Sequence, residues 1–328
     1  MAIGQTIDKF QILPEKGQLN QITIVMYHYV RPIQGSKYPR VKGLELDGFK
    51  RQLDYLSLNY NFVTASDVLL AIKGKKNLLP NSCWLTFDDG YKDHVLYVMP
   101  ELLKRGIQGA FFPPVAPVVN KVMLDVNCIH FILASERGRD KSTLVQDLNA
   151  LYSESGASEE SIEANWKKYS IPSRYDTDEV MYIKNMLQFV LPKGLRSEII
   201  STLFNSYVGI SQSDFANDLY LSFTDVQNLI NAGMYVGSHG FSHLWMNQED
   251  FASQKKEINM SIEFLESVGV DISEWIMCYP YGAYNQDTIK IISKKGCVAA
   301  LTTEVAKASL SREFAFKLPR FDTNDFPQ

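Results

Sequence analysis

The chain has 328 residues, of which 45% are hydrophobic and 21% are charged, and 37 acidic and 33 basic residues give a formal net charge of −4. This composition is typical of a folded globular protein with one large domain or two smaller ones. Acidic and basic residues are mixed along the chain, so the sequence lacks the basic surface that nucleic acids and anionic membranes attract. We therefore expect no nucleic acid among its partners.

The sequence also predicts where the protein is located and whether its cysteines are reduced. No stretch approaches the roughly 18 apolar residues that a membrane span needs, and the first residues lack the basic and apolar regions of a signal peptide. We therefore expect no membrane span and a cytoplasmic location. The four cysteines, at positions 83, 128, 278 and 297, have no CxxC spacing, which favours free thiols in apolar surroundings.

Short apolar segments alternate with helical patterns along most of the chain, which predicts an α/β fold with buried parallel strands. The predicted strands lie at 22–26, 84–87, 109–112, 235–237, 275–278 and 298–301. Helical spacing of apolar residues predicts helices at 49–56, 100–105 and 258–268, and a glycine follows the last two.

One long region does not follow this alternation. A polar tract at 153–160 is followed by helical patterns around 180–189 and 196–207. We predict a mostly helical insertion over 121–217, within a body over 21–328 that an N-terminal extension, 1–20, precedes. The insertion could shape the substrate groove or form the interface of a homo-oligomer, and its composition favours neither.

Reactive side chains repeatedly follow the predicted strands. They are His28, the pair Asp88 and Asp89, the pair His239 and His243, and the segment Pro280-Tyr281. The carboxyl ends of the parallel strands of a barrel converge on one face, where such folds build their sites. We therefore expect these segments to meet in one pocket.

The adjacent carboxylates of Asp88 and Asp89 stand where a strand opens into a turn, so they can point in different directions. One could then bind a metal ion while the other moves protons. The alternative is an ordinary turn in which Gly90 supplies a positive φ. His239 and His243 are four residues apart, a spacing that lets two imidazoles reach one ion. With one carboxylate they would leave coordination positions open for water and substrate.

The sequence resembles the polysaccharide deacetylase family, also called the NodB-homology or carbohydrate esterase 4 family. The resemblance rests on Thr86-Phe87-Asp88-Asp89-Gly90, His239-Gly240-Phe241-Ser242-His243 and Tyr279-Pro280-Tyr281-Gly282. It covers about residues 20–120 and 218–322 and leaves the insertion outside. It implies a distorted (β/α) barrel and a metal-dependent hydrolase that removes an acetyl group from an amino sugar.

The resemblance also implies a role for each matching residue. Asp88 would be the general base, and Asp89, His239 and His243 would hold a divalent metal ion. Zn²⁺ is our first candidate, and other first-row divalent ions suit the same ligands. The backbone N–H of Tyr281 would stabilise the oxyanion.

Two positions depart from the family pattern. Cys278 stands where the family has an arginine that orients the base. Arg320 is our candidate substitute because a guanidinium can bind a carboxylate through two hydrogen bonds, although it could be an ordinary surface residue. The Leu-x-His motif that supplies the acid for the leaving amine is missing. His28 is our candidate acid, and it could instead bind the sugar or form a hydrogen bond in the core.

We expect Pro280, Tyr281 and Tyr284, together with His28, to contact the sugar, because aromatic faces pack against the C–H surfaces of pyranose rings. The substrate would be an N-acetylated sugar in a glycan or in a nucleotide-linked or lipid-linked precursor of a surface glycan. Two other hypotheses are a related hydrolase of other C–N amide or O-acetyl bonds, and a carbohydrate-binding protein without catalytic activity.

Overall fold

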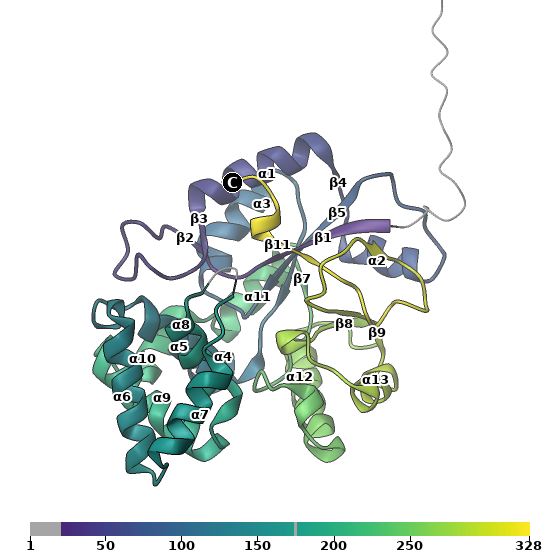
Figure 1. Cartoon of the computed structure of the whole chain (residues 1–328). Coiled ribbons are helices and arrows are strands. Elements are labelled where there is room, and N and C mark those ends of the chain that lie inside the picture. The colour runs from purple at the N-terminus through teal and green to yellow at the C-terminus, as the bar shows by residue number, and fades with distance from the viewer. Residues whose placement is uncertain (1–20, 174–175) are drawn as a thin grey trace, which may run out of the picture.

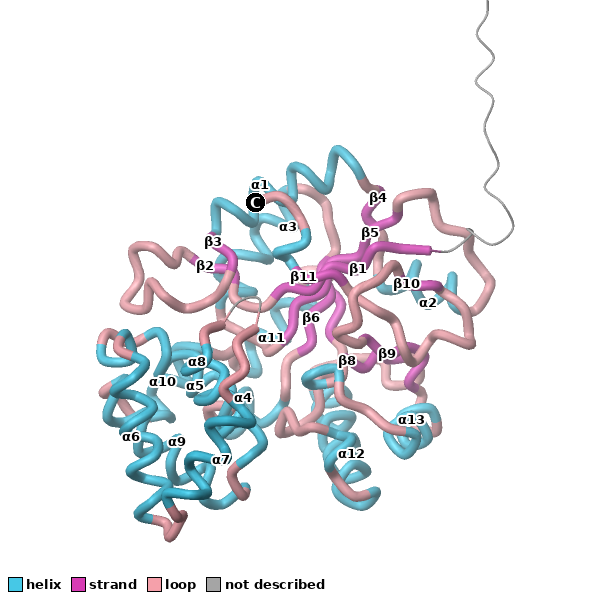
Figure 2. The backbone as a smooth tube through the Cα atoms, in the orientation of Figure 1, coloured by secondary structure: helices cyan, strands magenta, loops and turns pink. Residues whose placement is uncertain are grey.

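The computed structural model describes residues 21–173 and 176–328, and the expected extension at 1–20 lies outside them. Short strands gather at the centre of the molecule and helices surround them (Figures 1 and 2). The strands are β1 (Gln21–Tyr27), β2 (Val30–Arg31), β3 (Leu44–Glu45), β4 (Asn61–Phe62), β5 (Ser82–Asp88), β6 (Gly109–Phe112), β7 (Tyr235–Val236), β8 (Trp275–Cys278), β9 (Cys297–Leu301), β10 (Ala308–Ser309) and β11 (Phe321–Asp322).

The α-helices are α1 (Leu46–Asn59), α2 (Ala65–Ile72), α3 (Met99–Lys104), α4 (Val115–Asn120), α5 (Asp125–Ala134), α6 (Lys141–Glu154), α7 (Glu159–Tyr169), α8 (Asp178–Asn185), α9 (Lys193–Val208), α10 (Gln212–Leu219), α11 (Phe223–Asn231), α12 (Phe251–Ser267) and α13 (Gln286–Ser293). No helix within the described ranges is long and apolar enough to cross a bilayer.

Parallel strands close into a distorted barrel. Strands β1, β5, β6 and β7 pair in this order, and β8 pairs with β9. A bridge from Ser238 to Met277 joins the end of β7 to β8, and a bridge from Leu301 to Leu318 joins β9 to the segment before β11. Strand β11 then pairs with β1 and completes the ring. Two of the contacts between neighbouring strands are therefore single bridges, which explains why the barrel is distorted.

Successive side chains of a strand point to opposite faces, so each barrel strand contributes to two cores. In β5, Leu85 and Phe87 pack in the cluster that includes helices α1 and α3. Trp84, which precedes Leu85 and points to the other face, packs with Ile24 and Phe112 in the cluster of the barrel interior. Asp88 follows the same alternation as Trp84, so the strand delivers its carboxylate to the mouth of the barrel.

The predicted α/β class and distorted barrel are confirmed. The predicted strands at 109–112 and 275–278 coincide with β6 and β8, and the other four differ from the observed strands by at most two residues at either end. The sequence prediction omitted α2, whose apolar residues close the barrel interior, and β11, which has only two residues. So short a strand has too little periodicity to be recognised.

Helices α5 to α10, here called the helical layer, pack together beside the barrel (Figure 1). The layer begins within the region predicted as the insertion, 121–217, and ends two residues beyond it, at Leu219. It has an apolar cluster of its own, which includes Phe131, Leu144 and Phe204. The same cluster contains Tyr29 and Tyr91, from the loops after β1 and β5. The layer is therefore packed directly against the loops that carry the predicted site.

Candidate active site

The two aspartates at the end of β5 point in different directions because the backbone turns sharply between them. Asp88 is the last residue of the strand, whereas Asp89 has a left-handed backbone with φ of 68°. Gly90 follows with φ of 63°, and a Cβ there would lie 2.7 Å from Cβ of Pro113. A side chain at position 90 would thus clash as well as strain the backbone. The turn that glycine permits separates the two carboxylates.

Asp88 forms a buried ion pair with Arg320. The guanidinium nitrogens Nη1 and Nη2 lie 2.9 and 2.7 Å from the two carboxylate oxygens, and Arg320 is only 1% exposed. Nε of Arg320 also donates to the carbonyl oxygen of Thr302. Burial opposes ionisation of Asp88, but the charge of Arg320 outweighs it and lowers the pKa of Asp88 to about 2. Asp88 is therefore a carboxylate at neutral pH and can accept a proton.

Asp89 faces the two histidines. Its Oδ1 lies 3.4 Å from Nε2 of His239 and 3.3 Å from Nε2 of His243, yet this buried oxygen has no hydrogen-bond partner. The other oxygen, Oδ2, accepts a hydrogen bond of 2.6 Å from the Tyr91 hydroxyl. Nδ1 of His239 lies 2.8 Å from the carbonyl oxygen of Cys278, so a proton on Nδ1 leaves the Nε2 lone pair free. This donor set fits a cation bound between the three side chains.

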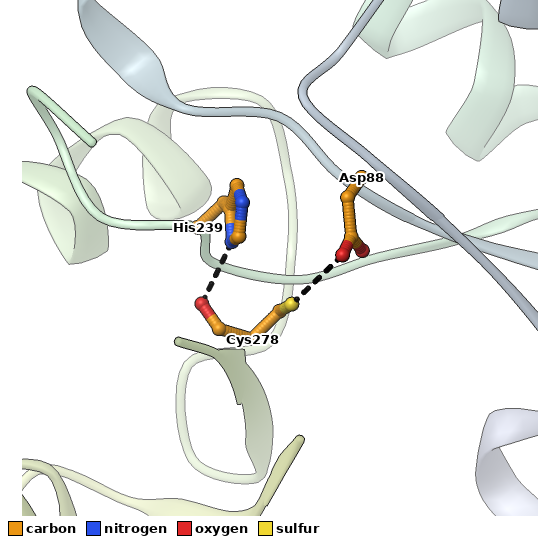
Figure 3. Close-up of side chains that lie close together, drawn as sticks. All are labelled: Asp88, His239 and Cys278. Atoms are coloured by element: carbon orange, nitrogen blue, oxygen red, sulfur yellow. Dashed lines mark hydrogen bonds between the residues drawn. The ribbon is translucent and has the colours of Figure 1, made fainter. Parts of the chain in front are cut away.

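A second set of possible ligands shares His239. Asp88, His239 and Cys278 also lie close together (Figure 3). However, the guanidinium of Arg320 binds both oxygens of Asp88 and lies 3.2 Å from Sγ of Cys278. A positive charge already occupies that side, and a metal ion there would be repelled by it. Asp89, His239 and His243 are therefore the set better suited to a divalent ion.

A cavity of about 450 Å³ opens beside His243. The ring of Trp245 stacks on Tyr281, with centroids 4.2 Å apart and planes inclined by 7°. The rings of Tyr281 and His243 meet edge to face, with centroids 4.6 Å apart. The helical layer and the turn after α8 also line the cavity, with Asp125, Val126, Gln188, Lys193, Arg196 and Ser197. An aromatic surface next to the predicted metal ligands is suited to packing against a sugar ring.

The remaining predicted residues lie at different places. His28 is partly exposed and close enough to Asp88 and Asp89 to lower the pKa of both. Pro280 is buried at the start of the turn that carries Tyr281. Tyr284 stacks on Tyr279, with centroids 4.5 Å apart, and does not contribute to the lining of the cavity beside His243. A direct contact between Tyr284 and a sugar in that cavity is thus not favoured by this arrangement.

Several residues at the site were not predicted from the sequence. Tyr91 follows the aspartate motif directly, and its position was the signal that could have indicated a partner for Asp89. Trp245 stands two residues after His243 and could have been noted as an aromatic residue beside a predicted ligand. Lys193 and Arg196 reach the cavity only because the helical layer folds back onto the barrel, and no local pattern indicates that.

Comparison with known proteins shows a similarity to one family. A sequence model of the family described as polysaccharide deacetylase matches residues 215–300, which include both histidines and the segment Pro280-Tyr281. Over this segment the chain is similar to the polysaccharide deacetylase family. No curated protein sequence matches the chain.

Solved structures of deacetylases share the fold. The Streptococcus pyogenes deacetylase PplD, in complex with acetate, is 16% identical with a TM-score of 0.54, and the match covers 92% of each chain. IcaB from Ammonifex degensii is 16% identical with a TM-score of 0.53 over 92% of this chain and 91% of that one. The BpsB deacetylase domain from Bordetella bronchiseptica is 13% identical with a TM-score of 0.50, covering 94% and 97%. At these identities the likeness concerns the fold.

Proposed function

We propose that this protein is a polysaccharide deacetylase that removes the N-acetyl group from an amino sugar with a divalent metal ion held by Asp89, His239 and His243. The observation that carries the proposal is the buried, unpartnered Oδ1 of Asp89, which faces the Nε2 atoms of both histidines. A divalent ion held there would polarise the amide carbonyl and lower the pKa of water. Zn²⁺ remains our first candidate, because two imidazoles and one carboxylate suit it.

Asp88 would act as the general base. It is 2% exposed and ionised, and it is adjacent in sequence to the proposed metal ligand Asp89. Arg320 would keep its carboxylate in one orientation, because two hydrogen bonds prevent rotation. Sγ of Cys278 lies 3.4 Å from Oδ2 of the same carboxylate, and Arg320 would take the role of the arginine expected at position 278.

The oxyanion and the leaving amine each need a partner. We propose the backbone N–H of Tyr281 for the oxyanion, because its ring already lies against His243 and its backbone is held in the left-handed region, with φ of 59°. We propose His28 for the leaving amine. Its support is its electrostatic influence on both aspartates.

The substrate would be an N-acetylated sugar within a glycan or a linked precursor. The stacked Trp245 and Tyr281 offer an aromatic face, and the cavity volume of about 450 Å³ has room for one or two sugar rings. A cytoplasmic location, which would favour a nucleotide-linked or lipid-linked precursor, stays a prediction from the sequence.

Incubation of the purified protein with N-acetylated sugars, O-acetylated sugars and small cyclic amides, followed by mass spectrometry, tests the proposal. We expect loss of one acetyl group from an N-acetylated sugar, and we expect chelation of divalent ions to abolish it. Turnover confined to O-acetyl esters or small amides would favour the related hydrolase instead. Activity that survives complete removal of divalent ions would contradict the metal site.

A further inference from the structure

A buried network of hydrogen bonds joins the helical layer to the proposed ligand Asp89. The side-chain nitrogen Nδ2 of Asn127, in α5, lies 2.7 Å from the hydroxyl of Tyr91, and that hydroxyl lies 2.6 Å from Oδ2 of Asp89. Asn127 and Tyr91 are both 0% exposed. The connection thus runs from an inserted helix to the barrel without contact with solvent.

The partners of Asn127 determine which way its amide points. Its Oδ1 accepts a hydrogen bond of 2.5 Å from the hydroxyl of Tyr220, whose oxygen in turn accepts from the backbone N–H of Leu124. Its Nδ2 donates to the hydroxyls of Tyr29 and Tyr91, at 2.8 and 2.7 Å. Both hydrogens of the amide nitrogen and its carbonyl oxygen are therefore used.

This arrangement also determines where the Tyr91 proton goes. A hydroxyl has one hydrogen, and the Tyr91 oxygen accepts a hydrogen bond from Asn127, so its own hydrogen is directed to Oδ2 of Asp89. Oδ2 is thereby engaged, while Oδ1 faces the two histidines without a hydrogen-bond partner. The network selects which carboxylate oxygen is free.

We propose that Asn127 is a positioning residue for the metal site: by directing the Tyr91 hydroxyl, it fixes Asp89 so that a single oxygen is presented to the ion. This inference rests on the proposed function, because it takes Asp89 to be a metal ligand. It assigns the helical layer a part in metal binding, in addition to forming a wall of the cavity. Partners that orient metal ligands typically affect metal affinity by about 10- to 100-fold.

The test compares Zn²⁺ affinities of the full-length protein, measured by competition with a chromophoric chelator, in two variants. Tyr91→Phe removes the hydroxyl that binds Asp89. Asn127→Asp keeps the side-chain shape but cannot donate, so two carboxylates compete for the Tyr91 proton. We expect each to weaken Zn²⁺ binding by about 10- to 100-fold. Bound Co²⁺ should show an altered visible spectrum, because the carboxylate is then free to change its binding mode.

Tyr182→Phe is the matched control. Tyr182 is also 0% exposed and lies in the helical layer, and its hydroxyl donates to Oδ1 of Asn149 at 2.7 Å, so the variant removes a similar bond that does not lead to Asp89. We expect it to bind Zn²⁺ and Co²⁺ as the wild type does. Asp89→Asn serves as the reference for loss of a ligand.

The outcomes separate this inference from the proposed function. If Asp89→Asn loses affinity while Tyr91→Phe and Asn127→Asp bind as the wild type, the positioning role is wrong and the metal site stands. If Tyr182→Phe weakens Zn²⁺ binding as much as Tyr91→Phe, the loss comes from general destabilisation of the helical layer. The positioning role is then again wrong. If the wild type binds no Zn²⁺, both fail. Should Asn127→Asp not fold, Tyr91→Phe decides alone.

Discussion

The guanidinium of Arg320 binds both carboxylate oxygens of Asp88 from 232 residues farther along the chain. The contact exists because β11 pairs with β1 and β1 pairs with β5, which brings the end of the chain to the mouth of the barrel. The strand that closes the barrel therefore also delivers the cation that keeps the proposed base ionised. Closure of the fold and the charge state of the site depend on the same segment.

Removal of Arg320 should destabilise the protein. Arg320→Met leaves Asp88 buried without its partner, and breaking a buried ion pair in this way costs about 3–5 kcal/mol. The free energy of unfolding in urea measures this. Lys50→Met is the control, because Lys50 and Asp47 form an exposed pair worth less than about 1 kcal/mol. An equal loss of unfolding free energy in the two variants would show that the buried Asp88–Arg320 pair stabilises the protein no more than the exposed pair does.

Asp88→Asn should reduce turnover without loss of metal. The amide cannot accept a proton from water, and general-base catalysis typically contributes about 10²- to 10⁴-fold to the rate. Rates of acetate release, together with the metal content of the same preparation, test the prediction. Asp89→Asn is the contrasting variant, which should lose both activity and metal. An Asp88→Asn enzyme with the wild-type rate would exclude Asp88 as the base.

The Asp88–Arg320 pair should also contribute a stability that depends on pH. The pKa of Asp88 is lowered to about 2 in the folded protein from an ordinary value of 3.8, so its contribution is complete above about pH 4 and is lost as pH falls through 2. The shift corresponds to about 2 kcal/mol. The difference in unfolding free energy between wild type and Asp88→Asn should shrink by about this amount between pH 5 and pH 2. A constant difference would mean that the pKa of Asp88 is not lowered by folding.

Trp245 should contribute to binding of the sugar more than to the chemical step. Trp245→Ala removes the ring that stacks on Tyr281 in the cavity, and an aromatic contact is worth about 1 kcal/mol. We expect KM to rise by about fivefold, with kcat changed less. Trp166→Ala is the matched control, because Trp166 lies in the helical layer and lines a different cavity. If kcat falls and KM is unchanged, the stacked pair does not bind the sugar.

Much of the barrel could be predicted from the sequence because its strands are short, apolar and followed by reactive residues. The motif at Asp88 and Asp89 and the spacing of His239 and His243 are local patterns, which can be recognised from the sequence alone. The two-residue strand β11 carries no periodicity, so barrel closure could be recognised only in three dimensions. The position of Arg320 beside Asp88 was proposed from chemical need, since no local pattern indicates the contact.

The helical layer could be predicted as helical but not as part of the site. Its amphipathic patterns indicate helices and say nothing about which surface they pack against. Asn127 occupies a buried helix position among apolar neighbours and resembles any core polar residue in sequence. Its connection to Asp89 depends on Tyr91, which reaches it from a loop 36 residues away. Long-range side-chain contacts of this kind are set by tertiary packing.

The most direct test of the metal site is the stoichiometry of divalent ions in purified wild type, Asp89→Asn and His243→Ala, measured by elemental mass spectrometry after dialysis against one equivalent of Zn²⁺. We predict one ion per wild-type chain and a strong loss in both variants, with Asp88→Asn still retaining the ion. A wild-type chain that retains no ion, or variants that retain as much as the wild type, would contradict a site formed by Asp89, His239 and His243.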